Sequence, residues 1–498
     1  MNKHNSHLPT PSIVNSKICL PTQTLTKPQA GFANAAQFGF SPEATGVANT
    51  ETLQKAVDRG GTIVVSLPGT YKMAGTVYIG SHTSLIFGNN VFLKKVAETG
   101  DFTHVFLNKG ALTKTYDHHI TIEGLQIIVN GVFKSFTEVF GLRGQIAFFY
   151  VKDLRIERFR CMDLVGAQFG IHVCTFEDIF IDDAIIKGQK DGIHLGRGKR
   201  FTIRDCVFQT VDDAIALNAH DYATSNPELG WIEEGVIENC HDLNQDHTEG
   251  FFCRVLAGAW IDWTPGMNVQ TSDTVVTEGR LYRVQAEADG TIYTSKTRPV
   301  HARGLEVLDG IHWHMIQEDV TYTAGVRNVV FRDIFLHKPR TGFSARFDND
   351  RYSRSYYPGA PVVQQEQLLF DNIRVTHQGS SDLISIGTPV DVLTITNSSF
   401  YNNTIRFTGN TALEDYLKTQ INFSGCVFKH NGEMILIANS LNRKNVTLQT
   451  ASNTVLSDHF KAVVVPGKGQ IVVESDLPGL KSDVSERINY SQTGQRIL

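Results

Sequence analysis

Two segments of the chain align on each other at an offset of 22 residues. Asp178–Leu195 reads DIFIDDAIIKGQKDGIHL, and Arg200–Leu217 reads RFTIRDCVFQTVDDAIAL. Apolar residues match apolar residues along this alignment: Ile181 and Ile203, Ile185 and Val207, Ile186 and Phe208, Ile193 and Ile215, Leu195 and Leu217. A repeat of about 20 to 50 residues built from short strands is typical of a solenoid, in which neighbouring coils share one core.

Three carboxylates occupy matching places in these two segments. Asp191 aligns with Asp213, and Asp212 stands beside it. Strands of adjacent coils lie roughly 4.8 Å apart, so the repeat predicts that the three side chains crowd together. Like charges at short range shift each other's pKa values and can divide acid and base roles between them. The pattern therefore predicts an active site, with one carboxyl group whose pKa is raised.

The neighbouring pair Asp212 and Asp213 needs a special backbone, because successive residues of a strand point to opposite faces. We expect the pair to lie where a strand meets a turn, so that both side chains reach the same side. The alternative is that Asp191 and Asp213 are turn residues whose side chains cap backbone N–H groups.

Short strand units with the same pattern recur along the chain and are separated by Gly, Pro and Asn turns: His119–Val129, Val151–Phe159, Thr175–Ile181 and Arg327–Leu336 are examples. Helical periodicity is confined to Thr50–Arg59, for which Thr50 is the expected N-cap. A helix placed before the first coil covers the open end of a β-solenoid. The sequence therefore predicts an all-β solenoid with an N-terminal capping helix.

One block interrupts the repeat, and the chain divides around it. We expect an N-terminal arm at 1–30, a first part of the solenoid at 31–251, a small inserted β module at 252–316, and a second part with a C-terminal cap at 317–498. The module contains Trp260, Trp263 and Trp313. It resembles, over about forty residues, a β module inserted in phage tail and surface-glycan proteins. Its tryptophans either stack on sugars or form the core of the module.

Composition excludes several classes of partner. The net charge is −5 and no Lys/Arg-rich run occurs, which argues against nucleic acid and against an anionic membrane surface. No run of 18 apolar residues and no Sec signal peptide is visible, so localisation stays open between the cytoplasm and export or virion association by another route. The cysteines form no C-x-x-C pair and predict buried apolar positions rather than disulfides or metal ligands: Cys19, Cys161, Cys174, Cys206, Cys240, Cys253 and Cys426. No cofactor and no metal is expected.

The sequence also resembles a known family. Phe38-Gly39, followed by Gly60-Gly61-Thr62 and Pro68-Gly69-Thr70-Tyr71, resembles the opening motif of pectin-lyase-like right-handed parallel β-helices. The segments K-D-G-I-H-L and V-D-D-A-I-A-L resemble the polygalacturonase signature of glycoside hydrolase family 28, which runs N-T-D-G-I-D and then G-D-D-C-I-A with the same spacing. The resemblance implies a right-handed β-helix and a carbohydrate substrate. It implies Asp212 as the general acid, with Asp191 and Asp213 activating water for inverting hydrolysis.

Two other motifs of that family are missing. The coil that should carry G-H-G has only His247 and Glu249 near that place, and the R-I-K motif that grips a uronate is represented by Arg346 alone. A uronic acid substrate therefore stays open. We expect Arg346 just past the strand position equivalent to Leu217, beside the aspartates. The candidate substrate-binding residues, some of which have equally good structural roles as wall histidines or ion-paired loop residues, are His172, His194, His220, His247, Glu249, Arg346, Asp348, Arg351 and Tyr352.

Two other functions compete with glycoside hydrolysis. A polysaccharide lyase of the same shape needs a basic residue to abstract a proton, and only Lys190 and Arg197 stand near the aspartates in the sequence. A non-catalytic, tailspike-like glycan-binding protein would use the solenoid as a stalk and the module to bind. The sequence leaves open the sugar, its linkage, endo or exo action, and the oligomeric state.

Overall fold

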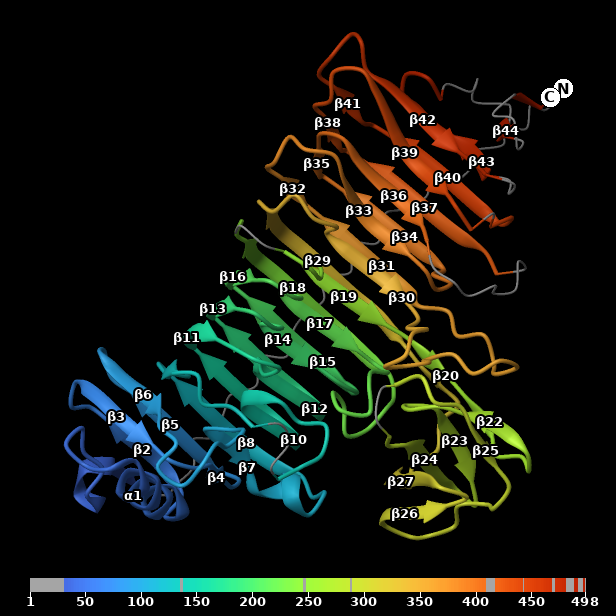
Figure 1. The fold of residues 1–498 in the computed structure, drawn as a ribbon. Coiled ribbons are helices and arrows are strands. Elements are labelled where there is room, and N and C mark those ends of the chain that lie inside the picture. Colours follow the sequence, from blue (N-terminus) through green and yellow to red (C-terminus); the bar gives the residue numbers. More distant parts are fainter. Residues whose placement is uncertain are drawn as a thin grey trace, which may run out of the picture.

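A computed structural model describes residues 31–134, 138–244, 248–286, 289–408, 417–441, 443–467 and 471–480, and the backbone of 488–490 and 496–497. Its coils stack into one long right-handed parallel β-helix that runs from α1 to the C-terminal coils, with a small module beside it (Figure 1). The predicted fold class is confirmed. No helix in these ranges is long and apolar enough to cross a membrane.

The coils have three faces, each a ladder of parallel strands. The first face contains β2 (Gly61–Val65), β5 (Thr83–Phe87), β8 (Asp117–Glu123), the second halves of β10 (Gly144–Glu157) and β12 (Phe169–Asp182), β15 (Gly198–Arg204), β18 (Ile232–Asp242), β29 (Val326–Leu336), β31 (Glu366–Asp371), β34 (Val392–Thr396), β37 (Thr419–Ser424), β40 (Val446–Ala451) and β43 (Ile471–Glu474). The second face contains β3 (Gly69–Met73), β6 (Val91–Lys95), β9 (Gln126–Ile128), β11 (Arg160–Leu164), β13 (Ile185–Gly188), β16 (Val207–Thr210), the last residues of β18 and of β29, β32 (Arg374–Val375), β35 (Ser399–Phe400), β38 (Val427–Phe428) and β41 (Thr454–Val455).

The third face carries the candidate site. It contains β4 (Val77–Ile79), β7 (Phe106–Asn108), the first halves of β10 and β12, β14 (Ile193–Leu195), β17 (Ile215–Asn218), β19 (Cys253–Leu256), β30 (Phe343–Arg346), β33 (Ser381–Ile386), β36 (Asn403–Phe407), β39 (Glu433–Asn439) and β42 (Lys461–Val465). The middle strands β14, β17, β19 and β30 lie side by side in Figure 1.

The register of the coils is the one that the repeat predicts. β13 pairs with β16 with Ile186 opposite Phe208, and β14 pairs with β17 with Ile193 opposite Ile215. The bends between the first and second faces use the recurring Asp or Asn of the strand unit. Asp183, Asp205 and Asn239 have φ angles of 50°, 55° and 50°. Asp and Asn tolerate this left-handed region better than other residues with a side chain.

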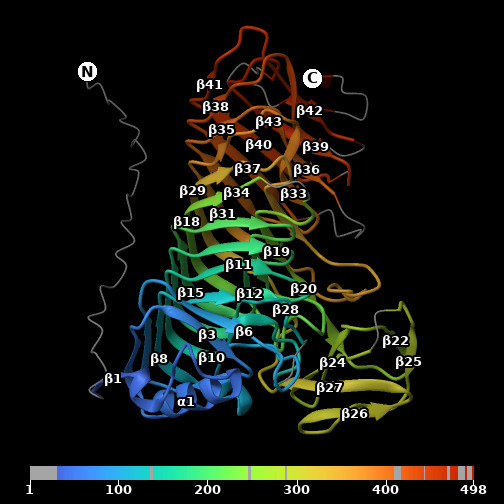
Figure 2. The ribbon, with the colours of Figure 1, turned by 60° about the vertical axis from the view of Figure 1, so that its left-hand side comes forward.

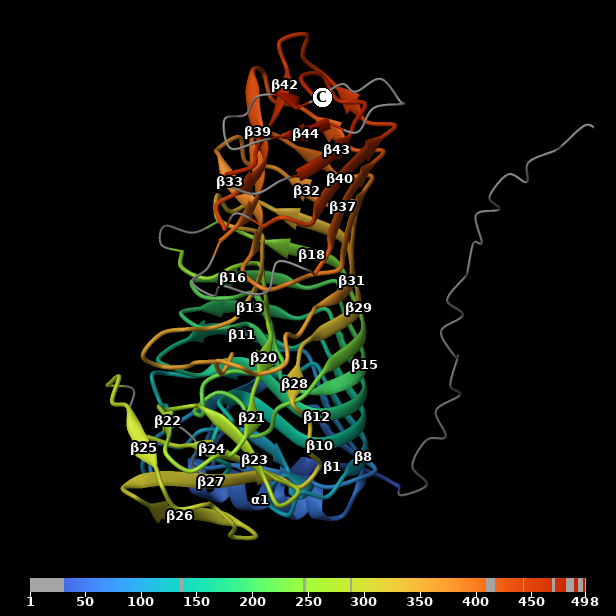
Figure 3. The ribbon, with the colours of Figure 1, turned by 90° about the vertical axis from the view of Figure 1, so that its right-hand side faces the viewer.

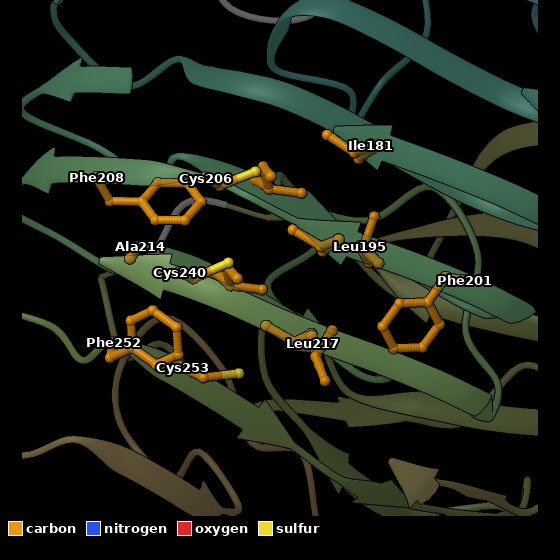
Figure 4. Close-up of a cluster of buried hydrophobic side chains, with 14 of the residues drawn as sticks. Ile181, Leu195, Phe201, Cys206, Phe208, Ala214, Leu217, Cys240, Phe252 and Cys253 are labelled. Atoms are coloured by element: carbon orange, nitrogen blue, oxygen red, sulfur yellow. The ribbon is translucent and has the colours of Figure 1, made fainter. Parts of the chain in front are cut away.

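The core is a continuous stack of inward-facing side chains, and the cysteines belong to it. Cys206, Cys240 and Cys253 lie among phenylalanine and leucine side chains inside the helix (Figure 4). The six described cysteines are buried and free, which confirms the expectation for them. Cys19 lies outside the described residues.

The capping helix α1 begins earlier than predicted. It spans Gly46–Asp58, and its N-cap is Thr45, whose hydroxyl accepts a hydrogen bond from the Ala48 N–H at 3.2 Å. The expected N-cap, Thr50, lies inside the helix and donates to the Gly46 carbonyl at 2.8 Å. The carboxylate of Glu98 accepts the N–H groups of Gly46 and of its neighbour at 2.9 and 3.0 Å. This distant carboxylate satisfies the free donors of the first turn, so the helix extends toward it.

The sequence predicts an inserted module at 252–316, and the strand pairing moves both ends of that range. β19 pairs with β17 and β30 and is part of the β-helix. The insertion runs from β20 (Gly258–Ala259) to its partner β28 (Thr323–Ala324). Between them lie β21 (Ile261–Asp262), β22 (Met267–Val269), β23 (Thr274–Thr277), β24 (Arg280–Val284), β25 (Tyr293–Ser295), β26 (Gly304–Leu308) and β27 (Ile311–Gln317).

The tryptophans of the module form core rather than a sugar-stacking surface. Trp313 and Trp263 are 0% and 7% exposed and pack in the module's own hydrophobic cluster. Trp260 is 1% exposed and joins the core of the β-helix. The module lies alongside the N-terminal coils (Figures 2 and 3). His314 meets Phe140 there edge to face, with ring centroids 6.3 Å apart.

We predict that Ile186→Ala lowers the free energy of unfolding by about 2 to 5 kcal/mol, because it leaves a cavity between coils. Ile186 is fully buried and stacks between Cys161 and Phe208. The matched control is Lys187→Ala on the same strand, whose side chain is exposed. Its effect should stay within about 0.5 kcal/mol. Urea unfolding followed by circular dichroism measures both, and equal effects would contradict the inward assignment.

Candidate active site

The three predicted aspartates converge where the second face turns into the third. Asp191 lies between β13 and β14, and Asp212 and Asp213 lie one coil further on, between β16 and β17. One carboxylate oxygen from each lies within 4.8 Å of the others. Asp191 and Asp213 are 2% and 1% exposed. The side chain of Asp212 is 23% exposed and is the member that reaches solvent.

The turn lets the two neighbouring aspartates face the same cluster, as expected. The Asp212 carbonyl accepts a hydrogen bond from the Thr210 hydroxyl at 3.0 Å, and regular strand resumes only at Ile215. One oxygen of Asp213 accepts the Phe251 N–H at 2.8 Å, so the capping alternative holds for that oxygen. The other Asp213 oxygen lies 3.0 Å from the Arg254 Nε. The carboxylate is therefore held on one side by backbone and on the other by a cation.

Two cationic side chains offset the negative charge of the cluster. Lys190 Nζ lies 2.6 Å from an Asp212 oxygen, and Arg254 lies against Asp213. Burial opposes the charge of Arg254, but Asp213 and Asp221 hold its pKa well above the ordinary value. Behind the turn, the buried Arg340 donates to the Asp212 carbonyl at 2.8 Å and pairs with Asp242 at 3.0 Å.

The raised pKa falls on Asp213, whereas the sequence predicts Asp212 as the acid. Burial raises the pKa of Asp213 to about 8, and the charges of Asp191 and Asp212 add to this against Arg254. Burial also acts to raise the pKa of Asp212, but Lys190 and Arg254 hold it below its ordinary value. In the unliganded protein the cluster therefore keeps its proton on Asp213 near neutral pH.

Two predicted histidines line the outside of the third face next to the cluster. His194 is fully buried, and its Nδ1 lies 2.8 Å from an Asp191 oxygen. His172 stands one coil earlier, with its ring 4.6 Å from that of His194. His220 has another role: it is 1% exposed, and its ring packs 6.0 Å from that of Trp260 at the root of the module. Burial lowers the pKa of His220 to about 3.

Arg346 lies on the predicted face. It pairs with Leu256 of β19, which in turn pairs with Asn218, the residue after Leu217. Its guanidinium stands 5.3 Å from the ring of Phe251, whose N–H binds Asp213. Arg346 also contacts Asp348 at 3.3 Å. Burial raises the pKa of Asp348 to about 6 against the charges of Arg254 and Arg346.

The loop after β30 brings an aromatic residue toward this face. Tyr352 is 42% exposed, and its ring lies 5.8 Å from that of Tyr222, which follows Asp221. The exposed Arg351 stacks over Tyr352 at 4.6 Å. The inserted module supports the loop, because the Ser272 hydroxyl donates to the Tyr352 carbonyl at 3.1 Å. Glu249 is exposed, and His247 lies outside the described residues.

Sequence reasoning missed Arg254 as a member of the site. Arg254 occupies the outward slot of β19 that Ala216 fills in the previous coil and His194 in the coil before it. The sequence feature that could have identified Arg254 is a charged residue inside the apolar strand F-F-C-R-V-L. The carboxylate spacing would also suit a cation, although Lys190 and Arg254 already contact the oxygens that such an ion would bind.

The fold is similar to that of known β-helix proteins, at low sequence identity. A hyperthermoactive exopolygalacturonase from Thermotoga maritima superposes with a TM-score of 0.51 at 12% identity, over 93% of this chain and 94% of that chain. A family 28 exopolygalacturonase from Yersinia enterocolitica gives a TM-score of 0.44 at 11% identity over 86% and 78% of the two chains. The Streptococcus pneumoniae surface adhesin PfbA gives 0.43 at 13% identity over 94% and 99%.

No known protein-family profile and no curated protein sequence matches the chain. At 12% identity, the likeness to the Thermotoga maritima protein supports the fold alone, a right-handed parallel β-helix.

We predict that Asp213 contributes less to the stability of the protein as pH rises from about 4 to about 8. Its pKa is about 8 in the folded protein and about 3.9 in an unfolded chain, so the folded state binds the additional proton between these values. Asp213→Asn removes this contribution and should flatten the dependence. The control is Asp182→Asn on the outer wall, which should retain the wild-type slope. Unfolding midpoints across pH measure the effect, and equal slopes for all three proteins would refute it.

Proposed function

We propose that this protein is a glycoside hydrolase that cleaves a poly- or oligosaccharide by acid/base catalysis with Asp191, Asp212 and Asp213. One observation carries the proposal: three carboxylates from two consecutive coils meet within 4.8 Å, two of them buried and one partly exposed. Burying carboxylates together is unfavourable for folding, and such strongly perturbed clusters are found mainly at functional sites.

Asp212 is the proposed proton donor, because a donor has to touch the glycosidic oxygen and Asp212 is the one partly exposed carboxyl of the three. In the free protein the proton rests on Asp213, and Asp212 is ionised beside Lys190. A sugar that displaces Lys190 removes the cation that keeps Asp212 ionised, and the proton then moves to Asp212. Asp191 and Asp213 are left as the pair that activates water.

For the stereochemical outcome we propose inversion, which the family resemblance implies. The carboxylate oxygens lie within 4.8 Å, whereas the carboxyl groups of inverting enzymes are usually roughly 6.5–9.5 Å apart and those of retaining enzymes roughly 5–5.5 Å. Inversion requires Asp191 and Asp213 to hold the water on the face of the anomeric carbon opposite the leaving oxygen that Asp212 protonates. The anomeric form of the first product, observed by proton NMR, distinguishes the two outcomes.

A lyase mechanism is less well supported, because both candidate bases are held as cations. Lys190 is paired with Asp212, and although burial opposes it, this contact raises the pKa of Lys190. Arg197 is engaged by Asp319 and by the buried Glu228. A purely binding role gives no reason for the raised pKa of Asp213, and the buried tryptophans of the module offer no stacking platform.

The direct test incubates the purified protein with a panel of neutral and acidic polysaccharides and oligosaccharides. We expect new reducing ends on one glycan class without ultraviolet absorbance, because hydrolysis adds water across the linkage. Unsaturated, absorbing products would establish a lyase. Binding without any new reducing end would establish the stalk-and-binder alternative.

We predict that Asp212→Asn reduces the rate on the natural glycan by about 10²- to 10⁴-fold, the usual contribution of proton donation. On an aryl glycoside whose leaving group needs no proton, this variant should keep most of its activity. Asp191→Asn should be slow on both substrates, because water activation is lost. Asp205→Asn on the outer wall is the control. Equal losses by Asp212→Asn on both substrates would contradict the assigned role.

A further inference from the structure

A buried histidine bridges two carboxylates directly behind the aspartate cluster. His194 Nδ1 lies 2.8 Å from Asp191 Oδ2, and its Nε2 lies 3.5 Å from Asp221 Oδ2. Asp191 is 2% exposed, and His194 and Asp221 are 0% exposed. Asp221 is itself fixed, since its Oδ1 accepts the Tyr222 N–H at 2.7 Å and its Oδ2 accepts the Asn218 amide at 2.6 Å.

The hydrogen-bonding capacity of the groups determines the proton count. An ionised carboxylate only accepts hydrogen bonds, and a neutral imidazole has one N–H and one lone pair. A neutral His194 between two ionised carboxylates would point its lone pair at one of them, a repulsive contact in a buried site. An imidazolium donates a hydrogen bond to Asp191 and turns its second N–H, rather than a lone pair, toward Asp221, an ion-pair contact of 3.5 Å. The charged histidine also offsets part of the negative charge of Asp191 and Asp221.

The neighbouring His172 is a neutral imidazole. Burial on the third face therefore does not by itself make a histidine charged. The Nδ1 of His172 accepts the Arg143 N–H at 3.1 Å, so this nitrogen carries no proton. Its Nε2 then donates to the Asn226 side-chain oxygen at 3.4 Å. Burial lowers the pKa of His172 well below its ordinary value, and the charge of His194 lowers it further.

Every element packed against His194 fits this role. From β12, the ring of Phe169 stacks on the ring of His194 at 4.3 Å and fixes the plane of the imidazole. The guanidinium of Arg143 stands 5.9 Å from the Phe169 ring. From β17, the small Ala216 lies beside His194. The remaining charged neighbour is Arg254, whose Nη2 lies 3.6 Å from Asp221 and whose Nε contacts Asp213. A chain of charged contacts, from Asp191 through His194, Asp221 and Arg254 to Asp213, thus lies beneath the cluster.

We propose that His194, held as an imidazolium between Asp191 and Asp221, is a positioning residue that keeps the Asp191 carboxylate aimed at the hydrolytic water. The inference rests on the proposed function and deepens it. Among the described residues, the only hydrogen bond to the Asp191 carboxylate is the one to Oδ2, which leaves Oδ1 for water. The polygalacturonase signature N-T-D-G-I-D ends in Asp where this chain has His194.

The kinetic test compares His194→Gln and Asp221→Asn with wild type on the cleaved glycan. Misplacing a catalytic group by about 1 Å costs about 10²-fold in rate, so we expect kcat to fall by that order with KM nearly unchanged. His241→Gln is the control, since His241 stacks on Phe335 at 4.4 Å on the second face. Unchanged kcat in both variants overturns the proposal.

A second measurement tests the bridge without activity. Histidine-selective ¹⁵N labelling identifies the ring of His194 by its loss in His194→Gln. We expect both ring nitrogens to be protonated at neutral pH in wild type, and one of them to be unprotonated in Asp221→Asn, which retains the shape of the site. One unprotonated nitrogen in wild type overturns the bridge. If wild type cleaves no glycan, the proposed function fails, whereas the NMR result still decides the bridge.

Discussion

The in-register stacking of coils is the constraint on which the rest of the structure depends. Each coil hydrogen-bonds to the next, so a residue and its counterpart in the following coil lie one strand spacing apart. In the core this places Ile186 over Phe208 and Ile193 over Ile215. Outside the core the same register brings Asp191 next to Asp212 and Asp213. The fold thus determines the separation of the carboxylates, and the side chains around them determine their charge.

Charge compensation makes this crowded arrangement stable. Arg254 lies between Asp213 and Asp221, Lys190 pairs with Asp212, and His194 lies between Asp191 and Asp221. Removing one partner of a buried pair leaves an uncompensated charge, which costs several kcal/mol, so the members depend on one another. The division between a buried, protonated Asp213 and a partly exposed, ionised Asp212 is a product of this environment and not of the residue type.

The parts that the sequence predicts are those that repeat with a fixed period. The solenoid, the buried cysteines and the convergence of the aspartates all follow from the 22-residue offset between two segments. Arg254 escapes this reasoning because 38 residues, not 22, separate Asp213 from Phe251 in the next coil, so the period is hidden by a loop. The start of α1 depends on Glu98, 52 residues from Gly46, and no local pattern reveals such a cap. The raised pKa of Asp213 likewise depends on burial, which sequence spacing does not report.

The most direct measurement of the central claim is a crystal structure of Asp212→Asn with a bound oligosaccharide. The acid/base account predicts that the glycosidic oxygen lies within hydrogen-bond reach of residue 212, about 2.6–3.2 Å, over the third face between Arg254 and Tyr352. It further predicts a water held by Asp191 near the anomeric carbon. A saccharide bound only to the inserted module or to the outer wall, with no sugar atom near residue 212, would contradict the account.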